Sequence, residues 1–315
     1  MLHWMRDRRS PGRWYLYVCC MLALSAMLSA MLSAMLPAIA AALTVQDDDF
    51  NAIELPAPAN RIVSLSPGAT AMLFAAGAGD RVVGTSAYSD EPAAAKRIER
   101  IGDAQSFDLE RILTLRPDVV VVWTGGTPAA EVARLQGVGL RIYHQHVKRL
   151  DDIPDSLRRL GALTGTSPEA QAAAAQLAQR IVALRSRYPQ KSAATVLIQV
   201  WDRPIYTVGR DQVITDVIHA CGFRNAFEDL NDVSPAVTLE SVLARDPDYI
   251  LALGSNQNEA QSWLQQWHQF ASMKAQRPGH TIAWSDPRLP TLGPGVVDAA
   301  EDLCRALQAV DPPRP

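Results

Sequence analysis

Two segments of the chain repeat one pattern of apolar and polar positions. They lie at residues 109–122 and 239–253, and each begins with Leu-Glu, carries Pro-Asp eight residues after the leucine and ends in an apolar run. The two glutamates, Glu110 and Glu240, are 130 residues apart (240 − 110). Each copy predicts a short helix, a turn marked by proline and a buried strand. We therefore expect two related α/β units, with a cleft between them where a small ligand could bind.

Apolar runs alternate with helical patterns through the rest of the chain. In the first half the pattern predicts strands at 61–65, 82–84, 118–123 and 140–143, and helices at 69–76, 129–136 and 153–163. In the second half it predicts strands at 194–200, 205–208, 248–253 and 281–284, and helices at 213–220, 259–270 and 296–310. Such alternation is typical of parallel sheets with helices on both faces. The sequence predicts an α/β fold of two Rossmann-like lobes with mainly parallel sheets, at 60–165 and 191–315.

A different pattern joins the two lobes. Ser167-Pro168-Glu169 has the residues of a helix start, with Ser167 as the N-cap and proline in the first turn. An alanine-rich segment with regularly spaced leucines follows and ends at Tyr188. A helix of about 20 residues spans roughly 30 Å. We expect a single long α-helix within 166–190 that connects the lobes and restricts movement between them.

Residues 1–42 have the pattern of a secretory signal. Four arginines, at positions 6, 8, 9 and 13, precede an apolar stretch from Trp14 to Leu36, and small residues follow up to Ala42. This order predicts a signal peptide, cleaved near Ala40 or Ala42, and export of the protein. Because the apolar stretch is long, an uncleaved anchor that spans the bilayer remains the alternative. A polar leader, 46–51, precedes the first lobe.

The charge of the chain argues against a nucleic-acid partner. The formal net charge is −3, and residues 1–42 contribute +3 from four arginines and one aspartate, which leaves about −6 for the remainder (−3 − 3). A surface of this sign repels phosphate backbones.

Two cysteines remain once the signal is removed. These are Cys221 and Cys304, and in an oxidising compartment two cysteines can form one disulfide. Two buried free thiols are the alternative, since unpaired cysteine is among the most buried side chains.

Aromatic residues gather where the predicted strands end, although aromatics make up 6% of the chain. They are Tyr88, Trp123, Trp201, Tyr206 and Trp284. Ligands of open parallel sheets bind beyond the carboxyl ends of the strands. Aromatic faces with few charges suit a large, flat, mostly neutral ligand. For each residue taken singly, packing in the core or anchoring of a turn is the alternative.

Two histidines of one predicted strand end, His144 and His146, are spaced to point to the same side and could share a metal ion. No Asp or Glu of suitable spacing joins them, so the sequence favours a solvated or hydrogen-bonded pair and predicts no metal site.

Several motifs occur in one particular order. They are RIVSLSP at 61–67, SAYSD at 86–90, DLE at 108–110, RPD at 116–118, and Trp123 followed by Gly125-Gly126. In this order the chain resembles the cobalamin-binding proteins of bacterial ABC importers, the BtuF-like group, over most of residues 60–310. The resemblance implies a periplasmic, non-catalytic protein with two α/β lobes, one connecting helix and the ligand in the cleft. Cobalamin or a related corrinoid would be its transported ligand, with no catalytic cofactor.

The resemblance also implies roles for individual residues. Ligand-binding roles are expected for Tyr88, Trp123, Gly125, Tyr206, Asp286 and Arg288. Glu110 and Glu240 would dock the two lobes onto an ABC permease, which works with ATPase subunits. Each also follows a residue suited to cap a helix, Asp108 and Thr238, and a carboxylate there favours the helix dipole.

Other ligands and one other class of protein stay open. Ala104 and Ser234 stand where relatives of the group carry aromatic residues, and related proteins bind haem or ferric siderophores. A secreted α/β hydrolase could use the same cleft, but it needs a nucleophile and a base side by side, and the strand ends offer no convincing pair.

Overall fold

The computed structural model describes residues 42–103, 106–188, 194–291 and 293–310. The predicted export signal lies outside these ranges apart from Ala42. Ala104, which stands where relatives of the cobalamin-binding group carry an aromatic residue, also lies outside them. Within them, no helix combines the length and the apolar character needed to cross a membrane.

Lobe one contains a parallel sheet of four strands in the order β4-β3-β5-β6. The strands are β3 (Ile62–Ser64), β4 (Val82–Thr85), β5 (Val119–Trp123) and β6 (Ile142–Gln145). The helices are α2 (Pro67–Ala75), α3 (Leu109–Leu115), α4 (Ala129–Gly137) and α5 (Asp152–Thr164), with 3-10 turns at Gly79–Arg81 and Ala93–Arg97. Successive side chains of a strand point to opposite faces of the sheet, so one buried strand supplies two cores. In β5, Val119 and Val121 pack against α2 and α5, whereas Val120 and Val122 pack against α3 and α4.

Lobe two repeats this arrangement with the order β12-β11-β7-β9, again parallel throughout. The strands are β7 (Thr195–Gln199), β9 (Arg224–Asn225), β11 (Tyr249–Leu253) and β12 (Thr281–Trp284). The helices are α7 (Val213–Ala220), α8 (Leu239–Arg245), α9 (Gln257–Gln265), α10 (Arg288–Thr291) and α11 (Val296–Val310), with 3-10 turns at Gln266–Gln269 and Lys274–Gln276. Helices α7 and α11 cover one face of the sheet, and α8 and α9 cover the other. The α/β fold with two lobes of parallel sheet is thereby confirmed.

One strand prediction in lobe two was partly wrong. The segment expected as a strand at 205–208 forms only the two-residue β8 (Ile205–Tyr206), which pairs antiparallel with β10 (Ala236–Val237) outside the parallel sheet. The fourth place in the sheet is taken by β9, which the sequence pattern did not indicate because it has only two residues.

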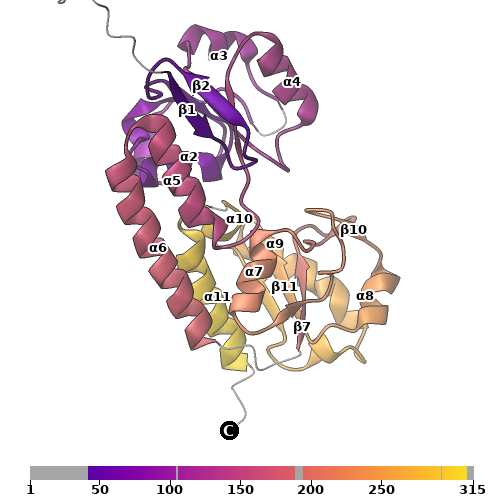
Figure 1. Cartoon of the computed structure of the whole chain (residues 1–315). Helices are drawn as coiled ribbons and strands as arrows, with labels where there is room; N and C mark the ends of the chain where they lie inside the picture. Colours follow the sequence, from indigo (N-terminus) through magenta and orange to yellow (C-terminus); the bar gives the residue numbers. More distant parts are fainter. Residues whose placement is uncertain (1–41, 104–105, 189–193, 292, 311–315) are drawn as a thin grey trace, which may run out of the picture. The chain divides into compact units, whose positions relative to one another are not determined.

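The connecting helix α6 (Ser167–Arg187) packs on both lobes. Its buried face joins the cores of α5 in lobe one and of α7 and α11 in lobe two into one apolar cluster. Figure 1 shows α6 running beside α5 and then beside α11. Arg180 on α6 donates to Asp298 and Glu301 on α11 at 2.6 and 3.2 Å. The predicted N-cap is one residue too late, because Thr166 precedes the helix and Ser167 is already helical.

A β-hairpin precedes lobe one and was not predicted. It consists of β1 (Leu43–Gln46) and β2 (Ala52–Leu55), and its turn is the segment that the sequence presented as a polar leader. Val45, Ile53 and Leu55 are buried in the core of lobe one. The leader is therefore an integral part of that lobe.

A disulfide joins Cys221, which follows α7, to Cys304 on α11. The two Cα atoms are 4.7 Å apart, and 83 positions of sequence separate the two residues. The bond ties together the two helices on one face of the lobe-two sheet, and it closes a long loop of chain.

Candidate ligand-binding site

A cavity of about 550 Å³ lies beyond the carboxyl ends of the strands in both lobes. Its described lining follows six parallel strands, β3 to β6 in lobe one and β11 and β12 in lobe two. The lining residues are Ser66, Pro67, Gly68, Tyr88, Asp90, Glu91, Lys96, Trp123, Gln145, Val147, Gly254, Ser255, Ser285, Asp286, Pro287, Pro290 and Thr291. The volume lies within the range of sites for small organic ligands.

Two aromatic residues of lobe one line this cavity. Trp123 is the last residue of β5 and is half-buried, and the main-chain N of Trp123 donates to Thr127 Oγ1 at 3.2 Å. Its indole ring lies against Gly126, where an added Cβ would come within 1.8 Å of ring carbon Cε3. Tyr88 follows β4 with a backbone φ of 62° and is 83% exposed. One ring is therefore fixed in the wall, and the other is displayed to solvent.

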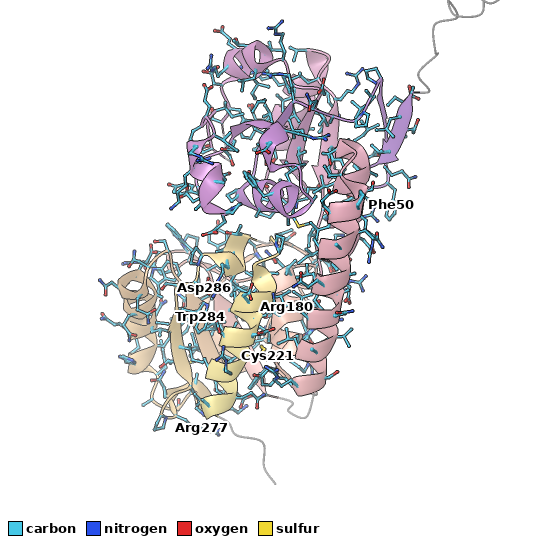
Figure 2. The ribbon with its side chains drawn as sticks, turned by 90° about the vertical axis from the view of Figure 1, so that its left-hand side faces the viewer. Phe50, Arg180, Cys221, Arg277, Trp284 and Asp286 are labelled. Atoms are coloured by element: carbon cyan, nitrogen blue, oxygen red, sulfur yellow. A yellow bond between two sulfur atoms is a disulfide. The ribbon has the colours of Figure 1, made fainter. Side chains whose placement is uncertain are left out.

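Asp286 is the charged group that the described lining receives from lobe two. Arg288 holds its carboxylate from the guanidinium, with Nε 3.0 Å from Oδ1 and 3.1 Å from Oδ2 and Nη2 2.5 Å from Oδ2, and from its main-chain N, 2.9 Å from Oδ1. It also donates to Asp302 at 2.9 Å. These hydrogen bonds hold the pKa of Asp286 below its usual range and raise that of Arg288. Figure 2 shows Trp284 and Asp286 at one end of lobe two and Arg277 at the opposite end.

The charge of the described lining is mainly negative. Three carboxylates, Asp90, Glu91 and Asp286, face one cation, Lys96. Arg100 neutralises Asp90 by donating from Nη2 to Oδ1 at 2.9 Å, as Arg288 does for Asp286. The described walls therefore present apolar surface, neutral hydroxyls and one amide. They offer little attraction to an anion.

Of the six residues expected to bind ligand, Tyr88, Trp123 and Asp286 line the cavity. Gly125, Tyr206 and Arg288 stand outside its described lining. Gly125 has a φ of 97°, and a Cβ added to it would lie 3.6 Å from Val233 of lobe two. The roles of all six in binding stay predictions.

Arg288 lines a second cavity of about 430 Å³ between α2 and the region of α10 and α11. The two cavities share Glu91 and Thr291 in their walls, so they adjoin. Tyr206 lies close to another aromatic strand end, since its main-chain N donates to the O atom of Trp201 at 3.2 Å. Trp201 is 50% exposed, and its ring centroid is 5.9 Å from that of Trp263.

Sequence reasoning missed several lining residues. Gln145, the last residue of β6, is buried at the cavity, and Val147 follows it. The end of this strand was recognised from the sequence, but the interpretation considered only its two histidines. Pro290 and Thr291 belong to the short helix α10, for which the sequence gives no periodic signal.

The histidines turn away from the cavity residues and interact with the hairpin. His146 Nδ1 lies 2.5 Å from Asp49 Oδ1, and His144 Nδ1 lies 4.0 Å from Asp49 Oδ2. The hydrogen-bonded interpretation is confirmed for His146, but the expectation that no acidic residue joins the pair was wrong, because Asp49 comes from a hairpin almost 100 positions away. Within the described ranges, no group of three or more side chains suited to a metal was found.

Glu110 and Glu240 occupy equivalent surface positions. Each is exposed and is the second residue of its helix, α3 or α8. The expected caps are present, because Asp108 accepts a hydrogen bond from Arg111 N and Thr238 accepts one from Ser241 N. Both helices also end alike, at residues with a φ near 45°.

Comparison with known proteins identifies the family of the chain. Residues 62–287 match the model of the periplasmic binding protein family. The vitamin B12-binding protein of Vibrio cholerae serotype O1 is 33% identical over 253 residues, which cover 80% of this chain and 91% of that protein.

Solved structures agree with this match. The crystal structure of the periplasmic vitamin B12 binding protein BtuF of Vibrio cholerae has a TM-score of 0.73 at 33% identity and covers 81% of this chain and 99% of that one. The periplasmic heme-binding protein RhuT from Roseiflexus sp. RS-1 has a TM-score of 0.68 at 26% identity and covers 78% and 97%. The chain therefore belongs to the periplasmic binding protein family, in which it is similar to vitamin B12-binding proteins.

Proposed function

We propose that this protein captures cobalamin or a related corrinoid in the periplasm and delivers it to an ABC permease. Similarity to vitamin B12-binding proteins over most of the chain supports the ligand class. The observation that carries the proposal is the cavity with Trp123 in one wall and Asp286 in the other. A flat ring system can lie against the indole, while the carboxylate accepts hydrogen bonds from amide groups at the ring's edge.

The charges of the lining favour a corrinoid over its main competitors. Cobalamin carries neutral amides around its ring, whereas haem carries two carboxylates. Arg100 and Arg288 neutralise two of the three acids in the described lining, which leaves Glu91 and Lys96, so propionates would find little attraction. An iron-bound siderophore with negative charge would find equally little.

A haem or ferric-siderophore carrier remains the second candidate, and Tyr88 is the observation that favours haem. Its phenol is exposed at the cavity and could ligate iron, as tyrosine does in some haem proteins. A hydrolase is less well supported. Ser66, Ser255 and Ser285 line the cavity, but no histidine stands among the described lining residues to act as a base.

Glu110 and Glu240 support the proposal that an ABC permease is the transport partner. Two exposed carboxylates at equivalent places of two lobes form a pair of anionic points, and a permease of two like subunits could meet them with two basic patches. The pair would guide docking of the loaded protein, with the ATPase subunits driving import.

A ligand panel tests the proposed function. Cyanocobalamin, haemin and a ferric hydroxamate siderophore are titrated separately into the purified protein, and binding is followed by the quenching of tryptophan fluorescence. We expect saturable binding of cyanocobalamin with at least tenfold preference over the other two. Preference for haemin, lost in Tyr88→Phe, would instead establish the second candidate.

A further inference from the structure

The turn of the hairpin β1–β2 meets the outer edge of β6 through consecutive aspartates. Asp48 N donates to His144 O at 3.0 Å, while His146 N donates to Asp48 Oδ2 at 3.0 Å. His144 N donates to Asp47 Oδ2 at 3.2 Å. The hairpin therefore satisfies main-chain groups that an edge strand would otherwise expose.

Asp49 makes contacts beyond this edge. Its Oδ2 accepts a hydrogen bond from Thr124 Oγ1 at 3.0 Å, and its Oδ1 lies 2.5 Å from His146 Nδ1. Thr124 directly follows Trp123, and His146 directly follows Gln145. Trp123 and Gln145 both line the cavity. One carboxylate thus holds the two segments that present these cavity residues.

We infer that Asp49 is a positioning residue of the ligand site, which ties the ends of β5 and β6 together. This inference rests on the proposed function for the identity of the ligand. The tie itself does not depend on that identity.

The surroundings of Asp49 favour its charged form. Burial acts to raise the pKa of Asp49, but hydrogen bonds from His146 and Thr124 and the nearby histidine charges outweigh burial and lower the pKa. The carboxylate therefore acts as a charged acceptor, and hydrogen bonds to a charged group are stronger than those between neutral groups.

The other charged groups of this region are already engaged. Asp48 is buried and receives hydrogen bonds from Tyr143, Ser156 and Arg159. Burial raises the pKa of Asp48, and these hydrogen bonds oppose the rise. Asp47 accepts hydrogen bonds within the hairpin turn. Among the contacts of the described residues, Asp49 is the aspartate of this turn whose carboxylate reaches both cavity segments.

The matched control is Arg141. It also links the hairpin to β6, with Nε donating to Glu54 O at 2.8 Å, but it precedes the strand and lies at the end away from the cavity. Arg141→Ala therefore loosens the hairpin without touching the tie. Asp49→Ala removes both contacts of the carboxylate, and Asp49→Asn removes its charge while keeping an acceptor.

The first measurement needs no ligand. Amide hydrogen exchange of the unliganded protein should quicken at 124–127 and 145–147 in Asp49→Ala and stay at the wild-type rate there in Arg141→Ala. Equal exchange in both variants at these segments would overturn the positioning role, whatever ligand the protein binds.

The second measurement is the affinity for cyanocobalamin. Asp49→Ala should weaken binding by roughly three- to tenfold, as expected for the loss of charge-assisted contacts that position the two segments. Asp49→Asn, which keeps an acceptor, should recover part of this loss, and Arg141→Ala should keep the wild-type affinity. Wild-type affinity in Asp49→Ala, or an equal loss in Arg141→Ala, would overturn the positioning role. Absence of cyanocobalamin binding to the wild type would count against the proposed function and leave the exchange result standing.

Discussion

Asp118 in lobe one and Asp248 in lobe two perform the same task, because each carboxylate holds the start of the strand next to its own. Asp118 Oδ2 accepts hydrogen bonds from the main-chain N atoms of Asn60 and Arg61, both at 2.8 Å. Asp248 Oδ2 accepts one from Thr195 N at 3.0 Å. The Pro-Asp pair of the repeat therefore fixes β3 against β5 and β7 against β11.

This relationship predicts matched losses of stability. Asp118→Ala and Asp248→Ala should each lower the free energy of unfolding by about 1–3 kcal/mol, because strand-starting amides lose a charged acceptor. Urea denaturation measures the effect. Asp155→Ala serves as the control, since this side chain is 60% exposed and pairs with its helical neighbour Arg158. Losses no larger than in the control would show that the repeated aspartates do not hold the strands.

A substitution beside Trp123 should weaken binding without removing any side chain. In Gly126→Ala the new Cβ would overlap the indole ring, so the ring must move out of the cavity wall. We expect the affinity for cyanocobalamin to fall roughly tenfold, equivalent to about 1.4 kcal/mol. Gly137→Ala, at the end of α4, is the matched control because its Cβ meets nothing within 4 Å. Equal affinities in the two variants would mean that the position of the ring is unimportant.

The exposed glutamates should act in transport and not in capture. Replacing both Glu110 and Glu240 with Ala should leave the affinity for cyanocobalamin within about twofold of wild type, since neither residue lines the cavity. Import of labelled cyanocobalamin into cells with the cognate permease should fall strongly. Asp155→Ala combined with Glu169→Ala controls for the loss of two first-turn carboxylates elsewhere. Lost affinity with normal import at saturating ligand would assign the pair to the pocket instead.

Asp286 should contribute to stability against acid. Arg288 lowers the pKa of Asp286 in the folded state. The stability that this carboxylate contributes is therefore fully present above the ordinary carboxylate pKa of about 4, and it is lost as the pH falls through the folded-state pKa. Arg288 is 37% exposed, so solvent screens part of the effect and its size should be modest. Between pH 5 and pH 3, wild-type protein should lose more unfolding free energy than Asp286→Asn. Urea denaturation at these pH values measures it, and parallel losses would rule out the contribution.

Much of the fold could be predicted because its signals are local. The strand 119–123 is an unbroken apolar run, and its proline-marked turn and helix cap recur 130 residues later. The hairpin could not be predicted in this way. Its turn carries Asp47 to Asp49, which suggest a solvated loop. Burial of Asp48 is made tolerable by tertiary hydrogen bonds from the β6 region and from Ser156 and Arg159 of α5.

The site could be predicted in part. The carboxyl ends of the strands were recognised, which located Trp123, and the family resemblance located Asp286. Gln145 and Thr291 carry no distinguishing pattern, and their place in the cavity depends on how two lobes far apart in the sequence meet. The partner of His146 was missed for the same reason, because no spacing rule links residues 49 and 146.

The central claim is tested most directly by calorimetric titration of cyanocobalamin into the wild-type protein and into variants of the aromatic residues. We predict one ligand per chain, and an affinity at least tenfold weaker when Tyr88 and Trp123 are both replaced by Ala, because each buried aromatic contact contributes about 0.5–1.5 kcal/mol beyond its buried area. Adding Tyr206→Ala to the double variant tests whether that residue also takes part. Absence of saturable binding to the wild type, or undiminished affinity in a folded double variant, would contradict the claim that this cavity captures a corrinoid.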